Sequence, residues 1–105
     1  SPAPTGLTAF VGDVSKASFD ASWNPVFVPT TPGAIIVGYN VFVSTTPGIT
    51  TSNTGLAGFT PIPQSRVIND ANGKLKFNTT YYFKVATVDT CGQGALSTEE
   101  FQIDT

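Results

Sequence analysis

The 105-residue sequence contains no histidine, and this absence removes several kinds of catalytic and metal site. Histidine is the commonest general base near neutral pH, and the Ser–His–Asp and Cys–His arrangements depend on it. Most zinc ligand sets also include it. The seven acidic residues are scattered, and the neighbours Glu99 and Glu100 would point to opposite faces of a strand, so they cannot form an acid–base pair. We therefore expect a protein that is not an enzyme and has no catalytic, cofactor-binding or metal-binding residues.

Charged residues are also scarce, at 11% of the chain against roughly 25% in an average soluble protein. The five basic residues are not clustered and the net charge is −2, so no positive stripe is available for nucleic acid. No apolar run approaches the roughly 18 residues of a membrane-spanning helix. The expected partners are therefore a neighbouring domain of the same polypeptide, another protein or a sister copy, without nucleic acid or membrane insertion.

A single cysteine, Cys91, cannot form a disulfide within the chain. We expect it at the tip of a hairpin as a free, reactive thiol, and an intermolecular disulfide is the alternative. Thr, Ser and Asn supply much of the polar surface, which favours an extracellular or cell-surface location. The sequence has no methionine and no signal peptide, so we expect a mature or excised piece of a longer protein.

The segment from Thr79 to Val88 has the clearest pattern of the sequence. Read as a strand, it places Tyr81, Phe83 and Val85 on one face and polar or smaller residues on the other. Its β-branched and aromatic side chains suit a pleated sheet better than a helix. We predict a central strand whose three large side chains face the core.

Eight prolines and ten glycines favour many short strands joined by turns. Alternation in two of these strands points Trp23 and Tyr39 toward the core. The other expected strands comprise residues 7–11, 17–23, 35–44, 59–62, 65–68 and 95–103. Together they predict an all-β fold, a seven-stranded antiparallel β-sandwich formed by residues 6–105 and preceded by a linker at residues 1–5.

The order of several motifs resembles a fibronectin type III domain, an immunoglobulin-like sandwich, over essentially the whole chain. These motifs are Pro4…Leu7, Ser22-Trp23, Ile36-Val37-Gly38-Tyr39-Asn40-Val41, Leu75…Thr79-Thr80-Tyr81-Tyr82-Phe83-Lys84-Val85 and Gly94-Ala95-Leu96-Ser97. The resemblance is strongest to bacterial versions found in secreted multidomain proteins. It implies that Leu75 is a core residue ahead of the central strand, and that the Tyr81 hydroxyl bonds nearby backbone in a tyrosine corner. Phe77 and Thr87 depart from the family pattern, which usually has proline and alanine at these positions.

The resemblance implies a non-catalytic module that acts as a spacer or protein-interaction domain. The larger protein would be secreted or on the cell surface, for example a carbohydrate-active or adhesive one. The alternative is a structural or decoration domain of a phage virion or surface filament. Fold alone does not decide between these functions.

Phe42 and Tyr82 are the candidate partner surface. Both are out of phase with the core residues of their own strands, and in this family the two strands are neighbours. We therefore expect an exposed aromatic pair, because contiguous exposed apolar patches tend to mark contact sites. The alternatives are ordinary cross-strand packing and a boundary with an adjacent domain.

Two short motifs carry little functional weight. Asp70-Ala71-Asn72-Gly73 lacks the later acidic ligands of a calcium loop, so we interpret it as a plain turn. Asn78-Thr79-Thr80 matches the pattern for N-glycosylation. Because it adjoins the predicted tyrosine corner, we expect it to carry no glycan.

Overall fold

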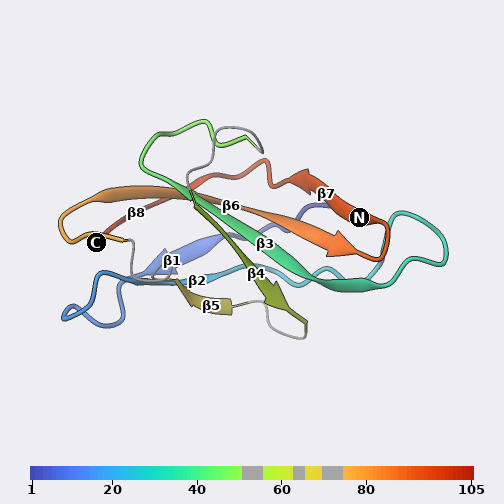
Figure 1. Ribbon diagram of the computed structural model, residues 1–105, viewed down its shortest axis with the longest axis horizontal. Helices are drawn as coiled ribbons and strands as arrows, with labels where there is room; N and C mark the ends of the chain where they lie inside the picture. The colour runs from blue at the N-terminus through green and yellow to red at the C-terminus, as the bar shows by residue number, and fades with distance from the viewer. Residues whose placement is uncertain (51–55, 63–65, 70–74) are drawn as a thin grey trace.

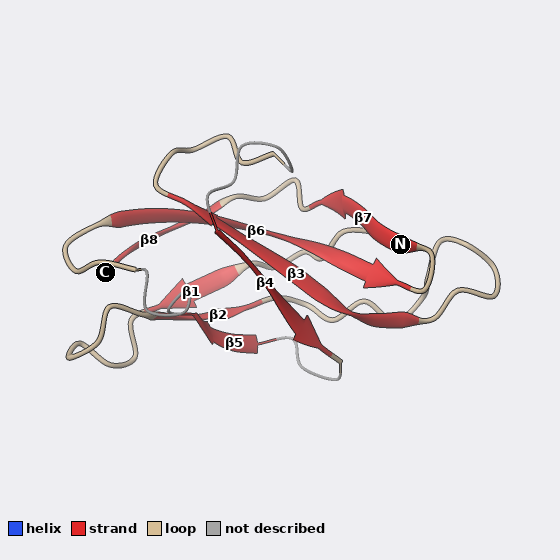
Figure 2. Ribbon diagram, viewed as in Figure 1, coloured by secondary structure: helices blue, strands red, loops and turns tan. Residues whose placement is uncertain are grey.

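Eight strands and no helix make up the part of the chain that is described in the computed structural model, residues 1–50, 56–62, 66–69 and 75–105 (Figures 1 and 2). Every strand pairing is antiparallel. Within these ranges no helix is long and apolar enough to cross a membrane. The strands are β1 (Thr8–Phe10), β2 (Phe19–Ser22), β3 (Ile36–Ser44), β4 (Leu56–Pro61), β5 (Arg66–Asn69), β6 (Thr80–Asp89), β7 (Gly92–Leu96) and β8 (Phe101–Asp104).

The strands form two sheets that pack as a sandwich. One sheet has the order β1-β2-β5, and the other has the order β4-β3-β6-β7, with β8 also paired to β6. Because β7 and β8 follow the same side of β6 one after the other, they act as two segments of one edge strand. Counted in this way the sandwich has seven strands, and the predicted all-β, immunoglobulin-like fold class is confirmed.

The last strand is interrupted, although a continuous strand was expected over residues 95–103. The break begins at Ser97, whose side chain is buried and replaces part of the missing ladder. Its hydroxyl accepts a hydrogen bond from the Val85 amide at 3.1 Å and donates to the Glu99 carbonyl at 2.9 Å. These bonds keep the buried backbone groups satisfied where the strand leaves the ladder.

The core lies between the sheets and is built by alternation. In β6 the side chains of Tyr81, Phe83 and Val85 are buried, as the sequence pattern predicts. Phe83 stacks against Phe19 from β2 with ring centroids 5.7 Å apart, so the two sheets are in direct aromatic contact. Aromatic pairs of this kind contribute beyond the area that they bury.

A tyrosine corner holds the chain ahead of β6. The Lys76 amide donates a hydrogen bond to the Tyr81 hydroxyl oxygen at 2.8 Å, and Leu75 beside it is buried. The last residue joins the same corner, because the Thr105 hydroxyl donates to the Lys76 carbonyl at 2.6 Å. It also accepts from the Thr79 amide at 3.1 Å. The predicted turn at residues 70–73 includes Asp70 and lies outside the described residues.

Candidate functional site

The predicted exposed pair of Phe42 and Tyr82 is not present in the form expected. Phe42 is only 7% exposed, and Tyr82 is half-buried. The loop after β3 folds back over this face of the sheet and places Ile49 against Phe42 and Ala86, with Leu96 at the margin. The expectation of an exposed Phe42 is therefore wrong, because strand alternation gives the face of a side chain but not what a loop later lays over it.

Glu100 holds this loop in place. Its carboxylate accepts hydrogen bonds from the Gly48 amide at 3.0 Å and from the Ile49 amide at 2.7 Å. Gly48 has a φ of 82°, a left-handed conformation that glycine adopts without strain. Burial opposes ionisation of the Glu100 carboxyl, but the two amide hydrogen bonds and nearby Lys84 outweigh it and lower the pKa.

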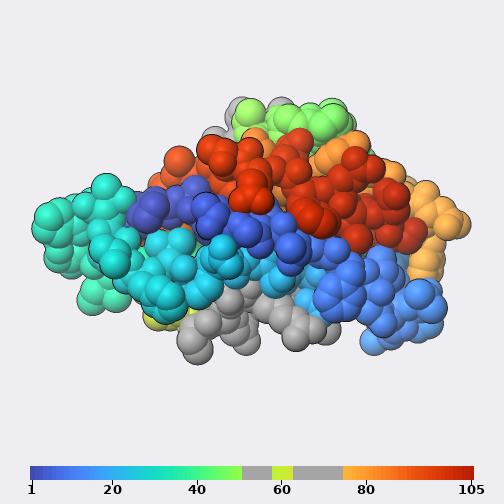
Figure 3. Space-filling view, turned by 180° about the vertical axis from the view of Figure 1, so that it is seen from behind, coloured from blue at the N-terminus to red at the C-terminus, as the bar shows by residue number. Residues whose placement is uncertain are grey.

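The loop between β2 and β3 projects at one end of the sandwich (Figure 3). Exposed apolar side chains lie on this loop and on the adjoining parts of β3 and β4. We call this group the apolar end surface. Its six side chains are all large and exposed, with Phe27 at 83% and Val28 at 73%. The members are Phe27, Val28, Ile35, Val37, Phe59 and Ile62. Three of them, Phe27, Ile35 and Ile62, line one pocket, whereas Phe59 is paired with Asn40 and points to the sheet face away from the core. Single exposed apolar residues are ordinary, so the group that lines the pocket is the informative one.

A cavity of about 360 Å³ opens within this surface. Its walls come from the loop between β2 and β3 and from the start of β3, including Phe27, Ile35 and Ile36, while Ile62 closes it from the β4 side. Tyr39 reaches its floor, and the Tyr39 hydroxyl accepts a hydrogen bond from the Val26 amide at 2.9 Å. The loop is therefore anchored to the core at the base of the cavity.

The β4 side of the surface is packed closely on β3. The Ile62 amide donates to the Val37 carbonyl at 3.1 Å, and the Phe59 ring lies over Gly38. A Cβ added to Gly38 would come within 2.5 Å of both the Phe59 ring and the Thr60 carbonyl oxygen. Glycine at this position thus leaves room for the Phe59 ring on the outward face of the sheet.

The apolar end surface is also without charge. Residues 21–65 contain no Asp, Glu, Lys or Arg, and all six of its side chains belong to this stretch. A partner that covers these six side chains therefore removes none of this segment's charged side chains from water, because the segment has none. Covering such a surface gains hydrophobic free energy without the desolvation cost of a buried charge.

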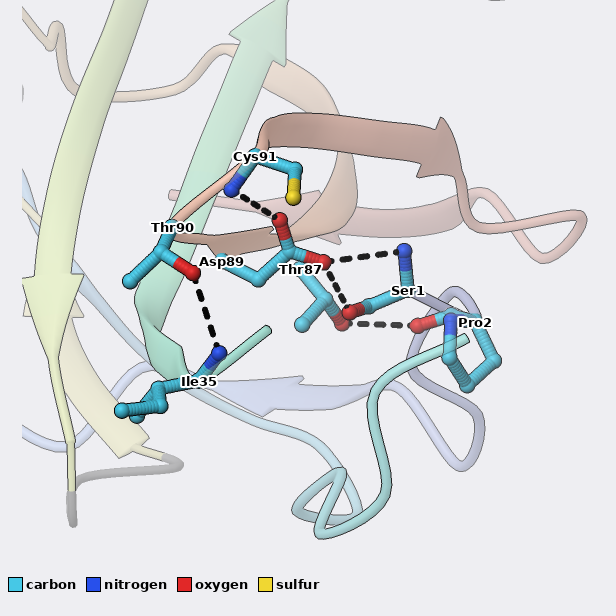
Figure 4. Close-up of polar contacts among 7 residues, drawn as sticks. All are labelled: Ser1, Pro2, Ile35, Thr87, Asp89, Thr90 and Cys91. Carbon is cyan, nitrogen blue, oxygen red and sulfur yellow. Dashed lines mark hydrogen bonds and ion pairs between the residues drawn. The ribbon is translucent and has the colours of Figure 1, made fainter. Parts of the chain in front are cut away.

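Hydrogen bonds fix the same end of the molecule from the opposite sheet edge (Figure 4). The Ile35 amide donates to the Thr90 hydroxyl at 3.1 Å, and the Thr90 amide donates to the Ile35 carbonyl at 2.9 Å. These bonds join the loop between β2 and β3 to the turn between β6 and β7. The turn also carries Cys91, which is exposed and free, as expected for a hairpin tip.

The N-terminal residues pack beside this turn. The Ser1 hydroxyl donates a hydrogen bond to the Asp89 carboxylate, and the Ser1 amino nitrogen lies 3.3 Å from the Asp89 Oδ2 atom (Figure 4). The Thr87 hydroxyl donates to the Pro2 carbonyl at 2.8 Å. Hydrogen bonds from the Ser1 hydroxyl and then the Cys91 amide lower the pKa of Asp89, although burial opposes this. Residues 1–5 were predicted to be a linker, and here they lie against the sandwich.

Comparisons with known proteins agree on the architecture. The third fibronectin III domain of the human KIAA0343 protein superposes with a TM-score of 0.77 at 18% identity, over 99% of this chain and 81% of that one. An Fn3-like protein from Clostridium thermocellum gives a TM-score of 0.65 at 24% identity, over 98% and 91% of the two chains. The chain has the fibronectin type III fold.

The same fold is also found as one part of longer proteins. The spore cortex lytic enzyme SleM of Clostridium perfringens matches with a TM-score of 0.61 at 21% identity, over 97% of this chain but only 27% of that one. Neither a protein-family model nor a curated protein sequence matches the chain. The comparisons therefore establish a fibronectin type III fold. They do not give its function, which has to be inferred from the surface residues.

In this fibronectin type III fold, the structure places all the predicted core residues between the sheets. They are Trp23, Tyr39, Leu75, Tyr81, Phe83 and Val85. Asn78 is exposed with a φ of 52°, and the absence of a glycan there stays a prediction. Across the described ranges, no three His, Cys, Asp or Glu side chains gather in a way that could hold a metal.

Sequence reasoning missed the apolar end surface although a signal for it was present. The long interval without charge between Asp20 and Arg66 coincides with the aliphatic and proline-rich segment that forms it. Strand alternation predicts the face of a side chain only within a strand, and it says nothing about loop residues such as Phe27 and Val28. Alternation predicts an exposed Phe42, and the structure buries it.

Proposed function

We propose that the chain is a non-catalytic module of a larger secreted or cell-surface protein, where it serves as a spacer and interaction domain. Its protein partner or neighbouring domain would contact the apolar end surface. The observation that carries the proposal is the uncharged cavity lined by the exposed apolar side chains of Phe27, Ile35 and Ile62, with Val28 exposed on the same loop. The Phe42 and Tyr82 face, which the sequence favoured, is a weaker candidate because Ile49 already covers Phe42.

The surface is suited to binding because its backbone is already held in place. Tyr39 anchors the loop at Val26, and Thr90 anchors it at Ile35. A surface whose loops are ordered before binding loses less conformational entropy when a partner arrives. An apolar patch on a rigid support also agrees with the anatomy of interface centres, where charged residues are depleted.

The spacer role is supported by the relation of this fold to longer chains. The match within the lytic enzyme SleM covers about a quarter of that protein, so a domain of this shape can serve beside other domains. The low charge and the abundance of Thr and Ser support a secreted or cell-surface location. A carbohydrate-active or adhesive parent protein is the more specific form of the proposal.

Covalent footprinting tests this function. The chain alone and the longer protein that carries it are each labelled in solution with a diffusible carbene, and labelling is read residue by residue. We expect labelling at Phe27, Val28 and Ile35 to fall severalfold in the longer protein, because the neighbouring domain or its bound partner covers them. Phe77, which is 54% exposed on a distant turn, is the control and should label equally in both. Equal labelling of the apolar end surface in both samples would contradict the proposal.

A further inference from the structure

We infer that the protein partner inserts a tyrosine side chain into the cavity beside the loop between β2 and β3. The inference rests on the proposed function, because it names the group with which the partner fills that cavity. Three properties of the cavity support it: its size, its lack of charge, and a hydroxyl group that can still donate a hydrogen bond. Each of them limits the side chains that can enter.

The cavity has the size and the order that an aromatic side chain needs. Its volume of about 360 Å³ lies at the lower end of the range of about 300–1,000 Å³ that is usual for ligand pockets. Its walls are held in place before a partner arrives, because Val26 is bonded to Tyr39 and Ile35 to Thr90. The side chains that most often fill desolvated pockets at the centre of an interface are Trp, Tyr and Arg. These three are the candidates for the inserted group.

The absence of charge in the lining excludes arginine. Among the described residues that line the cavity, none has a charged side chain, and all except Tyr39 have side chains of hydrocarbon only. A guanidinium group that entered here would lose its hydration without meeting a carboxylate, which is costly for an ion. The inserted side chain is therefore uncharged, which leaves tyrosine and tryptophan.

The hydroxyl of Tyr39 distinguishes between these two. It lies at the cavity, because the amide that it bonds belongs to Val26, which is also a lining residue. The hydroxyl oxygen accepts from this amide at 2.9 Å, and the hydroxyl proton has no acceptor among the described residues. Since Tyr39 is only 1% exposed, an acceptor for that proton has to come from a group inside the cavity. An indole can only donate, whereas a tyrosine hydroxyl can accept, so tyrosine is the side chain that fits.

Titration of the chain with p-cresol, which is the tyrosine side chain without its backbone, tests the inference. Toluene is the phenylalanine counterpart. Binding is followed by NMR of the Val26, Ile35 and Ile62 amides, up to about 20 mM p-cresol, since so small a group is expected to bind with a millimolar dissociation constant. We expect p-cresol to shift these signals.

The decisive quantity is the ratio of the p-cresol to the toluene association constant. We expect this ratio to be about tenfold higher for the parent than for Tyr39→Phe, because the variant offers no proton to the cresol oxygen. The ratio cancels the different costs of taking the two compounds from water, and also any general weakening of the cavity by the substitution. Tyr82→Phe, which removes a hydroxyl from a half-buried tyrosine outside the cavity lining, is the matched control and should leave the ratio unchanged.

A second compound keeps the test decisive if Tyr39→Phe does not fold, which near-ultraviolet circular dichroism shows. 4-Methylanisole has the acceptor oxygen of p-cresol but no proton to donate. It should bind the parent within about threefold of p-cresol, because the cavity hydroxyl is the donor. Loss of binding would show that the cresol hydroxyl has to donate, and would overturn the inference.

The results separate this inference from the proposed function. If p-cresol does not shift the cavity signals, or if Tyr39→Phe leaves the ratio unchanged, the tyrosine anchor is overturned. Toluene that binds with an unchanged ratio would mean that a hydrocarbon side chain fills the cavity, which contradicts the inference and not the proposed function. Footprinting of the longer protein decides the proposed function by itself, since it reports the cover over Val28 and Ile35 whatever group enters the cavity.

Discussion

Single side chains with one defined partner hold the ends of this sandwich. Tyr81 illustrates this, because its ring is in the core while its hydroxyl oxygen accepts the Lys76 amide from the preceding turn. The sequence predicted the bond to backbone, and the structure shows that the backbone group is a donor. The polar atom of Trp23 differs from that of Tyr81, because the buried Nε1 atom of Trp23 has no hydrogen-bond partner among the described residues.

Replacing Tyr81 by phenylalanine removes only the hydroxyl and leaves the Lys76 amide without its acceptor. We expect Tyr81→Phe to lower the free energy of unfolding by about 1 kcal/mol, the low end of the cost of leaving a donor unsatisfied, because this bond is only partly buried. Urea denaturation measures this change. Tyr82→Phe, a matched change on the opposite face of the same strand, should have a smaller effect. Equal denaturation midpoints for parent and Tyr81→Phe would contradict the tyrosine corner.

Two glycines of the β3–β4 pair make a second test at the scale of the residue. A Cβ at Gly38 would meet the Thr60 carbonyl oxygen and the Phe59 ring at 2.5 Å, whereas a Cβ at Gly58 has no neighbour within 4 Å. We expect Gly38→Ala to destabilise the protein by about 1–3 kcal/mol, as other overpacked sites do. Gly58→Ala should be neutral or slightly stabilising. Thermal unfolding of both variants compares them, and equal melting temperatures would show that Phe59 does not lie on Gly38.

At the scale of the element, the loop after β3 changes the character of a whole sheet face. By placing Ile49 over Phe42 and Ala86 it forms a second, smaller core outside the sandwich. Two amide hydrogen bonds to one carboxylate, that of Glu100, hold the loop. The carboxylate comes from the interruption between β7 and β8, so the break in the edge strand has a structural use.

The link through Glu100 makes the stability of this loop depend on pH. The pKa of Glu100 is lowered in the folded state, so the carboxylate stabilises the fold fully above the unfolded value of about 4.3. This stability is lost as the pH falls through the lowered folded value. We expect Glu100→Gln to be less stable than the parent at neutral pH, and the difference to shrink at acidic pH, where the parent carboxyl is also neutral.

Urea unfolding of parent and Glu100→Gln at a series of pH values measures this difference. Asp13 and Asp89 also have lowered pKa values, but both variants share them, so their contribution cancels in the comparison. A difference that stays constant from neutral to acidic pH would show that the Glu100 charge does not hold the loop.

At the scale of the whole molecule, the fold was predictable from the sequence and the candidate site was not. Alternation in β6 and the order of Trp23, Tyr39 and Tyr81 indicate an antiparallel sandwich, because burial on one face of a strand leaves a period of two in the sequence. The positions of loops leave no such period. The cover over Phe42 and the projection of Phe27 both depend on loops, and these are where sequence and structure differ.

Both ends of the described chain are attached to the same strand. The Ser1 hydroxyl bonds Asp89 at the last residue of β6, and Thr105 bonds Thr79 just before its first residue. The molecule is 44 Å long, and its two termini lie toward opposite ends of that axis (Figure 1). A pull on the termini therefore acts along β6, parallel to the strand and perpendicular to its ladder hydrogen bonds. Those bonds are then loaded together in shear and do not open one after another. The pairing of β6 with its neighbouring strands is therefore what resists the tension.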